Sequence, residues 1–429
     1  MHLTLQFKKS SPVVFAVVLI WQSLLFAQAP CGQPQWSGYF EPLTNGEGLR
    51  YPLSMGPLSW RLLGHQIQPV KGSDGMIHLA YALQVTNSWS RPATLKSIEV
   101  VDPAHDNGVT GKYAVVTAKE QDITGKLRLL SLPVTQDVSN FRTEVPAGQS
   151  GIAYFDVTYA DPAQVPRAIA HRVVVSAADH DGKPQDFTVL SPPMRLDCNP
   201  PIVLAPPFKG DGWVNANGCC KEIGPHRFVM NSINGSLAAT EEFAIDWIRV
   251  DAQGHQFNGD PKDPKAWVGY GAELLAVAPG MVVEVMDGLP DVAAGKAPDN
   301  LTIPQIAGNR VIIDIGQGRF AEYDHLAPHS VTVKVGAYVQ QGQKIGLLGN
   351  SGNTTAPHLH FQLMDRPSPL DGAALPFVFA YMQLQGRITI NLDELEAMWN
   401  NPSPVPMDTK LAKSLTFAMP LSLDVVSFK

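Results

Sequence analysis

Two histidines in one short segment are the residues of this chain best suited to do chemistry. Residues 349–362 form a Gly-rich turn that leads into a strand-like stretch carrying His358 and His360. Side chains two residues apart on a strand point to the same face, so the two imidazoles would project side by side from a fixed backbone. Imidazole is a common metal ligand, so this spacing predicts a metal site. Surface strands also carry such pairs by chance, so the prediction depends on the surrounding sequence.

The surrounding segment resembles the His-x-His motif of the lysostaphin-type (M23) zinc metallopeptidases, a family that includes many peptidoglycan endopeptidases. Other stretches similar to that family precede the motif in the family's order. They are Phe-Ala-Ile-Asp-Trp at 243–247, Glu-Tyr-Asp-His-Leu at 322–326, and the stretches 333–336 and 341–346. The similarity spans roughly residues 225–379, and it implies an antiparallel β domain with a grooved active site.

The resemblance implies that His226, Asp246 and His360 bind one zinc ion (Zn²⁺). In the most familiar members the first histidine precedes the aspartate by four residues, whereas His226 lies twenty positions before Asp246. We interpret the turn-rich residues 231–236 between them as a loop insertion that brings His226 back to the metal. Three protein ligands leave one position open for water, as a catalytic zinc requires, whereas a fourth protein ligand would make the site purely structural.

The remaining family histidines, His325 and His358, are implied to be catalytic and not to bind the metal. His358 would take a proton from the attacking water and later pass it to the leaving amine. His325 would donate a hydrogen bond to the tetrahedral oxyanion, although the two histidines could share both tasks. On a strand, Asp324 would face away from His325 and is expected to lie in solvent.

Three classes of function are compatible with these residues. The first is an exported zinc metalloendopeptidase that cuts peptide bonds in peptidoglycan cross-links or stems, or in an extracellular protein. The alternative is a non-catalytic module that binds the cell wall or activates another hydrolase, as in relatives that have lost ligands; here all five positions are filled. The third is a carrier domain, because the spacing of Val, Ile and Gly in residues 335–346 faintly resembles that of lipoyl-type domains. No lysine lies in a suitable hairpin motif, however.

The N-terminal composition predicts export. In residues 1–29, Lys8 and Lys9 precede a short apolar run and small residues, the pattern of a secretory signal peptide, with a retained anchor as the alternative. We therefore expect a secreted or periplasmic protein without a membrane span after signal removal. A net charge of −7 without a basic cluster argues against nucleic acid as a partner. Export permits disulfides, and Cys198 paired with Cys219 or Cys220 would tie the two domains together.

The elements that must position these residues are predicted to be strands, so the fold class is mainly β. Residues 35–195 contain alternating apolar stretches divided by Pro, Gly, Asn and Asp, which favours an immunoglobulin-like β-sandwich. Residues 196–212 are expected to form a Pro-rich linker. Residues 213–429 would form an antiparallel M23-type peptidase domain with a C-terminal strand extension.

Individual elements follow from local patterns. In the first domain, strands are predicted at 77–85, 155–159 and 171–175. In the second domain, strands are predicted at 281–285, 311–315 and 331–335. Residues 391–400 are expected to form one short helix with Asn391 as its N-terminal cap.

Overall fold

The computed structural model describes residues 54–64, 66–104, 114–119, 127–131, 142–220, 225–400 and 403–429. Strands dominate, and almost all of their pairings are antiparallel, so the predicted fold class is confirmed. The signal peptide expected at 1–29 lies outside the described residues. Within them, no helix is long and apolar enough to cross a membrane.

The first half of the described chain consists of two antiparallel sheets. One contains β1 (Leu58–Leu63), β2 (Val70–Lys71), β3 (Ile77–Asn87), β6 (Leu127–Leu129) and β8 (Ser150–Tyr159). The other contains β4 (Ala93–Val101), β5 (Ala114–Lys119), β7 (Glu144–Val145), β9 (Ala168–Ala178), β10 (Pro184–Leu190) and β11 (Met194–Arg195). Alternate residues of both sheets, such as Leu79 on β3 and Leu95 on β4, join one buried cluster, so the sheets pack face to face. The three strands predicted here are confirmed, and the immunoglobulin-like topology stays a prediction.

The second half is organised around a large sheet with the strand order β12-β24-β27-β13-β16-β23-β20-β19-β18-β21, and β25 and β26 also pair with β24. Its strands are β12 (Ile202–Leu204), β13 (Gly210–Asn217), β16 (Ile245–Arg249), β18 (Gly280–Met286), β19 (Asn309–Asp314), β20 (Phe320–Leu326), β21 (Tyr338–Val339), β23 (Leu359–Met364), β24 (Phe377–Ile388), β25 (Met407–Asp408), β26 (Lys413–Ala418) and β27 (Asp424–Phe428). Because β12 pairs with β24, part of the stretch expected as a linker belongs to this sheet.

Short elements complete the second half. Two separate pairs are β14 (Met230–Ile233) with β15 (Ser236–Ala239), and β17 (Glu273–Leu275) with β22 (Lys344–Leu347). Among the described residues, the α-helices are α2 (Pro225–Phe228) and α3 (Leu392–Ala397). In this half, 3₁₀ turns lie at η3 (Pro264–Ala266), η4 (Ile303–Gln305), η5 (Met398–Asn400) and η6 (Thr409–Leu411), while η2 (Pro162–Gln164) belongs to the first half. As predicted, Asn391 caps α3, because its side chain accepts the Glu394 N–H.

Two local predictions are corrected by the structure. Residues 331–335 form no strand, since Thr332 bonds to β22 and Gly336 bonds to β18 in place of one continuous ladder. The loop insertion expected at 231–236 is the β14–β15 hairpin. Its turn residues Asn234 and Gly235 have φ of 52° and 77°, which is the geometry of a two-residue type I′ turn.

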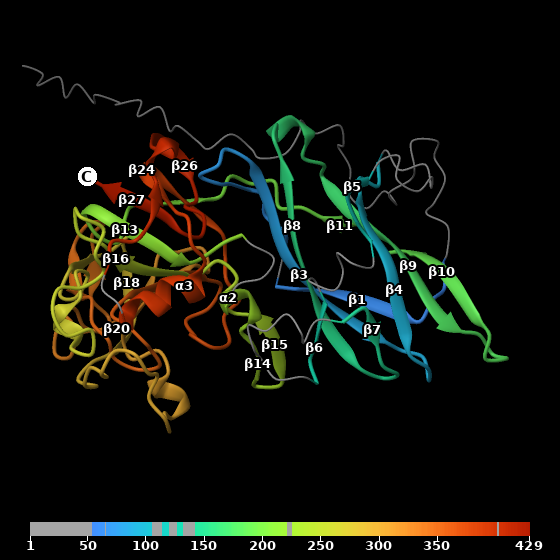
Figure 1. Ribbon diagram of the computed structural model, residues 1–429, viewed down its shortest axis with the longest axis horizontal. Coiled ribbons are helices and arrows are strands. Elements are labelled where there is room, and N and C mark those ends of the chain that lie inside the picture. The colour runs from blue at the N-terminus through green and yellow to red at the C-terminus, as the bar shows by residue number, and fades with distance from the viewer. Residues whose placement is uncertain are drawn as a thin grey trace, which may run out of the picture.

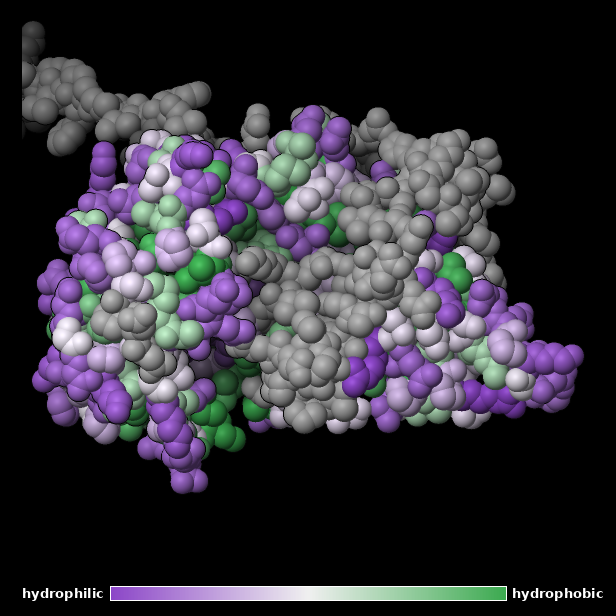
Figure 2. Space-filling view, viewed as in Figure 1, coloured by the Kyte–Doolittle hydropathy of each residue, from purple (hydrophilic) through white to green (hydrophobic). Residues whose placement is uncertain are grey.

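The two halves lie side by side along the long axis of the molecule (Figure 1). On the face shown in Figure 2, hydrophilic residues dominate the outer surface, and several hydrophobic residues gather along the boundary between the halves. One buried apolar cluster crosses that boundary, joining residues of the first sheet to residues of α2, β14 and β15. Its members are Leu63, Ala82, Ile152, Tyr154, Phe228, Met230 and Ala239. The halves therefore share a core.

His78 on β3 lies buried between two carboxylates. Its Nδ1 lies 3.0 Å from both oxygens of Asp156, and its Nε2 lies 3.3 Å from both oxygens of Asp74. Burial lowers the pKa of His78, but the hydrogen bonds and charges of the two carboxylates outweigh burial and raise the pKa to about 9. The imidazole is therefore charged in the folded protein at neutral pH.

We expect the free energy of unfolding to fall as the pH rises from about 6.5 to about 9. Since the pKa of His78 is raised on folding, its ion pairs contribute fully below pH 6.5, and this stability is lost as the pH passes the folded pKa of about 9. The loss is roughly 3 kcal/mol, because one pKa unit corresponds to about 1.4 kcal/mol. Urea unfolding of the metal-free protein across this range should show that His78→Gln loses about this much of the pH dependence, while the part due to His360, whose pKa is raised to about 10, remains. His180→Gln, at an exposed pair with Asp181, should keep the full dependence, and equal profiles for both variants would contradict the assignment.

Cys220 lies beside this histidine but does not make the group a metal site. One donor atom each of His78, Asp156 and Cys220 lies within 4.8 Å of the others. Cys220 is bonded to Cys219, however, and metals bind the thiolate form of cysteine.

The same disulfide makes the predicted pairing of Cys198 with Cys219 or Cys220 wrong, because Cys219 and Cys220 are bonded to each other.

Candidate metal centre

Four adjacent strands carry one row of polar side chains across the large sheet. The strand register pairs Asn217 of β13 with Asp246 of β16, and Asp246 with His360 of β23. His360 in turn pairs with Asp324 of β20. Directly opposed residues of neighbouring strands place their side chains on the same face, so the whole row faces one way. All four residues line a cavity of about 250 Å³.

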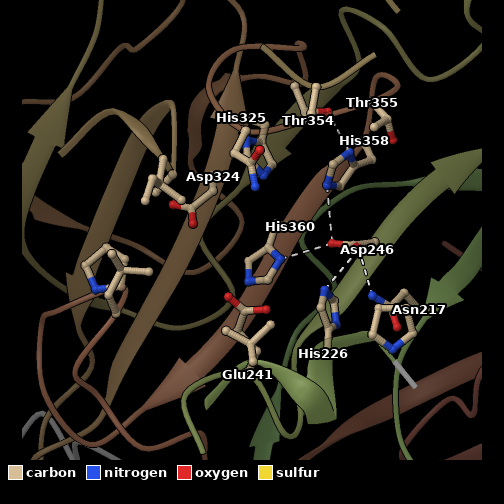
Figure 3. A pocket seen from close by; sticks show the side chains of 18 residues that line it. Asn217, His226, Glu241, Asp246, Asp324, His325, Thr354, Thr355, His358 and His360 are labelled. Carbon is tan, nitrogen blue, oxygen red and sulfur yellow. Dashed lines mark hydrogen bonds and ion pairs between the residues drawn. The ribbon is translucent and has the colours of Figure 1, made fainter. Parts of the chain in front are cut away.

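The three predicted ligands meet in this cavity. His226 Nε2 lies 3.0 Å from Asp246 Oδ2, and His360 Nδ1 lies 3.0 Å from Asp246 Oδ1. One donor atom from each residue lies within 4.8 Å of the other two, and their side chains point toward one another in Figure 3. Two imidazole nitrogens and one carboxylate oxygen form a donor set that suits zinc and leaves room for a fourth ligand. The residues present therefore fit the expected metal.

Backbone carbonyls orient two of these groups. His226 Nδ1 lies 3.1 Å from the carbonyl oxygen of Ala244, which can only accept, so Nδ1 carries the proton and Nε2 presents its lone pair to the cavity. On the other side, Asn217 Nδ2 donates to Asp246 Oδ2 over 3.2 Å. Fixed tautomers and oriented carboxylates are what a metal site requires of its surroundings.

Asp246 dominates the electrostatics of the cavity. Burial raises its pKa, but the charges of His226 and His358 outweigh burial and hold the pKa well below its ordinary value. Burial lowers the pKa of His360, but the hydrogen bond and charge of Asp246 raise it to about 10. In the metal-free protein the carboxylate is therefore ionised and His360 is protonated, so a metal ion that bound His360 would have to displace that proton.

The two predicted catalytic histidines lie together beside the ligands. The ring centroids of His325 and His358 are 4.7 Å apart, and His358 Nε2 lies 3.3 Å from Asp246 Oδ1. Each donates its Nδ1–H to a carbonyl, His325 to Ser351 over 2.7 Å and His358 to Ala356 over 2.7 Å. Both rings therefore turn Nε2 toward the cavity, and Nε2 is the acceptor in the neutral form of each ring. Burial and then the charges of His358 and His360 hold the pKa of His325 well below its ordinary value.

The expectation that Asp324 lies in solvent is wrong. Asp324 is only 4% exposed and lines the cavity opposite His360. Asp324 faces the cavity because it pairs directly with His360, and the φ of 63° at His325 breaks the alternation of β20 so that His325 faces the cavity as well. Burial and the neighbouring charge of Glu322 raise the pKa of Asp324 well above its ordinary value.

The turn before β23 is held by hydrogen bonds of its own side chains. Asn350 accepts a hydrogen bond from Thr354 Oγ1 and donates to the carbonyl of Val292, while Ser351 Oγ donates to the carbonyl of Leu326. Thr354 Oγ1 also lies 3.3 Å from His358 Nδ1, so the turn helps to orient the His358 ring.

Two further cavity residues were not found from the sequence. Asn217 lies on a strand that carries no recognisable motif. Glu241 points toward His360 in Figure 3, and its charge contributes to the raised pKa of His360. A second cavity of about 180 Å³ adjoins the first beside Asp246 and His358 and is bounded by α3 and Trp399.

Comparison with known proteins supports the family assignment made from the motifs. Residues 267–372 match the model of peptidase family M23, which confirms the resemblance to the lysostaphin-type peptidases. The matched segment contains His325, His358 and His360 but begins after His226 and Asp246, so the case for those two ligands depends on the geometry described above.

Similar curated proteins include the peptidoglycan DD-endopeptidase ShyA of Vibrio cholerae, which is 45% identical over 65 residues, 15% of each chain. Lysostaphin of Staphylococcus staphylolyticus is 30% identical over 128 residues, 30% of this chain and 25% of lysostaphin. The chain thus spans at most a quarter of the length of these relatives. Among solved structures, the lysostaphin catalytic domain from Staphylococcus simulans is 24% identical, with 39% of this chain and 86% of that domain covered and a TM-score of 0.20.

Proposed function

We propose that this chain is an exported zinc endopeptidase that hydrolyses peptide bonds in peptidoglycan cross-links or stems. The observation that carries the proposal is the cavity in which His226, Asp246 and His360 converge beside His325 and His358. ShyA is a peptidoglycan DD-endopeptidase, and its similarity to this chain supports the choice of peptidoglycan as the substrate. The negative net charge and the absence of a basic cluster in the sequence disfavour nucleic acid as a partner.

The residues of the cavity divide the chemistry between them. Zinc held by two imidazoles and a carboxylate would supply Lewis-acid chemistry, which polarises a peptide carbonyl and activates water near neutral pH. The neutral form of His358 has its lone pair at Nε2, because Nδ1–H is bonded to the Ala356 carbonyl, so this form can accept the proton of the attacking water and return it to the leaving amine. Thr354 and the carbonyl of Ala356 keep that ring in the required orientation.

His325 is better suited to accepting a proton than to the oxyanion-donor role expected from the family. Its Nδ1–H is used by the carbonyl of Ser351, so its neutral ring has no N–H at Nε2. Burial disfavours the imidazolium that would restore this donor. We therefore propose that His325 supports His358 in proton transfer.

The test is the release of new amino groups from purified peptidoglycan by the purified protein. Zinc-loaded protein should release amines, chelation should stop the release, and added zinc should restore it. Protein that holds one zinc ion per chain and yet cuts neither peptidoglycan nor any protein substrate would overturn the proposal. If metal-free protein bound peptidoglycan as tightly as the zinc-loaded form, the non-catalytic module would be favoured.

Zinc affinity is expected to rise with pH between about 6 and 8. In the metal-free protein His360 has a pKa of about 10, so it is protonated over this whole range and must lose its proton to bind a metal. Protons therefore compete with zinc, and about one proton should leave per zinc bound. Titration calorimetry in buffers of different ionisation enthalpy measures that number directly. A zinc affinity independent of pH, with no proton released, would exclude His360 as a ligand.

A further inference from the structure

His226, the first proposed metal ligand, lies on a helix that is too short to be stable on its own. α2 contains only the four residues Pro225–Phe228, and a single helical turn has little stability of its own in water. Nevertheless His226, Arg227 and Phe228 are all buried. The contacts that fix His226 must therefore come from elsewhere in the fold, and Figure 1 shows α2 at the boundary between the two halves.

Arg227 reaches from α2 into the first half of the protein. Its Nη2 lies 2.9 Å from the carbonyl oxygen of Tyr81 on β3 and 3.0 Å from that of Phe155 on β8. These two residues are direct partners in the β3–β8 ladder, so one guanidinium group bridges two adjacent strands. Arg227 is only 3% exposed, and hydrogen bonds from a buried charged group are among the stronger ones in proteins.

The same guanidinium group also binds the segment that leads to the second metal ligand. Arg227 Nη2 donates to Glu242 Oε1 over 2.9 Å, and Glu242 precedes Asp246 by four residues. In between, the carbonyl of Ala244 accepts the proton of His226 Nδ1. Arg227 thus links the β3–β8 ladder, the helix that carries His226 and the backbone that orients both His226 and Asp246.

Phe228 provides a second anchor on the same sheet. Its ring packs edge-to-face on Tyr154 of β8, with centroids 5.3 Å apart. Arg128 of β6 donates to the Phe228 carbonyl over 3.3 Å. The two residues that follow His226 are therefore held by the first half, although no residue before Asn217 is among those that line the cavity.

From these contacts we propose that the first half of the chain is a structural part of the metal centre, and that Arg227 is the positioning residue that keeps His226 in place for metal binding. The inference rests on the metal site proposed above. It assigns the first half a role in building the site, and among the described residues none of that half covers the cavity as an inhibitory lid would.

The experiment compares two contacts across the same boundary. We call the hydrogen bonds of Arg227 to Tyr81, Phe155 and Glu242 the Arg227 clamp. The double variant Arg227→Met/Glu242→Gln removes this clamp without leaving a buried unpaired carboxylate. Glu242→Gln alone keeps both bonds to the β3–β8 ladder. The matched control is Arg387→Met, because Arg387 of β24 also crosses the boundary, binding Asp424 over 2.8 Å and Ser73 over 3.3 Å. Zinc affinity is measured on each metal-free protein by competition with a chelator, and thermal unfolding of the metal-free proteins is measured in parallel.

We expect the double variant to bind zinc about 10- to 100-fold more weakly, which is the usual cost of losing a group that orients a metal ligand. Arg387→Met and Glu242→Gln should stay within about twofold of wild type, even where they lower the unfolding temperature. Excess zinc should restore amine release by the double variant, and Arg227→Lys should recover part of the affinity because its ammonium retains donors for the same carbonyls.

Three results would overturn the inference. Wild-type zinc affinity in the double variant would show that Arg227 only stabilises the fold. An equal loss of affinity in Arg387→Met would show that any weakening of the boundary has the same effect. If the wild-type protein bound no zinc, both the metal centre and the positioning role of Arg227 would be refuted. Weaker zinc binding by the double variant, in a protein that cuts no peptide, would instead leave the clamp standing and reject the proposed function.

Discussion

Replacement of Asp246 by alanine is expected to abolish zinc binding and to reduce amine release from peptidoglycan by at least about 10³-fold. Asp246 is the only carboxylate in the candidate donor set, and its two oxygens contact His226 and His360 at 3.0 Å and His358 at 3.3 Å. Without it, two imidazoles remain, which is fewer than the three protein ligands of a catalytic zinc. Losing metal assistance removes several kcal/mol of transition-state stabilisation, and about 4 kcal/mol corresponds to roughly 10³-fold in rate.

The fold should survive this substitution, because the apolar cluster of the large sheet lies apart from the carboxylate. Asp314→Ala is the control, since Asp314 is an aspartate of β19 in the same sheet whose carboxylate bonds only locally to the Gly316 N–H among the contacts described. Metal content and amine release are measured for both variants. An Asp246→Ala protein that keeps one zinc ion per chain would remove Asp246 from the ligand set.

The sequence was sufficient to predict those parts of the site that depend on short periodic segments. The spacing of His358 and His360 placed both on one face, and the structure brings both to Asp246. The same local patterns correctly predicted β18, β19 and the cap of α3 by Asn391. These features depend on alternation and on hydrogen bonds between near neighbours, which a single sequence records.

Features set by unusual backbone geometry could not be predicted in the same way. Asp324 faces the cavity because it pairs with His360, and the left-handed φ of His325 brings the next side chain to the same face. L residues other than glycine rarely adopt such angles, so strand alternation gave the wrong face for Asp324. The hairpin at Asn234-Gly235 is a different case. Its signal was present in the sequence, because Asn-Gly is the preferred pair for a type I′ turn, but the segment was interpreted as a loop.

The location of His226 is a third case, in which the deciding contacts are distant along the chain. Arg227 bonds to Tyr81 and Phe155, which lie 146 and 72 positions away in the sequence. No local pattern around residue 226 encodes those partners. The family resemblance suggested the ligand, and the packing of the two halves explains how a histidine so far from Asp246 in the chain reaches it.

Replacement of His358 by alanine is expected to lower kcat by about 10² to 10⁴-fold while leaving one zinc ion bound, which is the usual effect of removing a general acid or base. His358 contacts Asp246 but is outside the candidate three-residue donor set, and its Nδ1–H is fixed by the Ala356 carbonyl so that Nε2 faces the cavity. Steady-state amine release gives kcat, and metal analysis of the same protein gives the zinc content. Loss of zinc in this variant would make His358 a ligand.

The partner variant His325→Ala tests whether the two rings act as a unit. If they share proton transfer, the double variant His325→Ala/His358→Ala should lose little more activity than His358→Ala, since residues that act together are strongly non-additive. His255→Ala serves as the control, because His255 bonds to Asp251 and is not among the residues that line either active-site cavity. Zinc and turnover lost together at Asp246, with turnover alone lost at His358, would separate the ligands from the acid–base pair. Independent losses at His325 and His358 that multiply in the double variant would instead assign the two histidines to different steps.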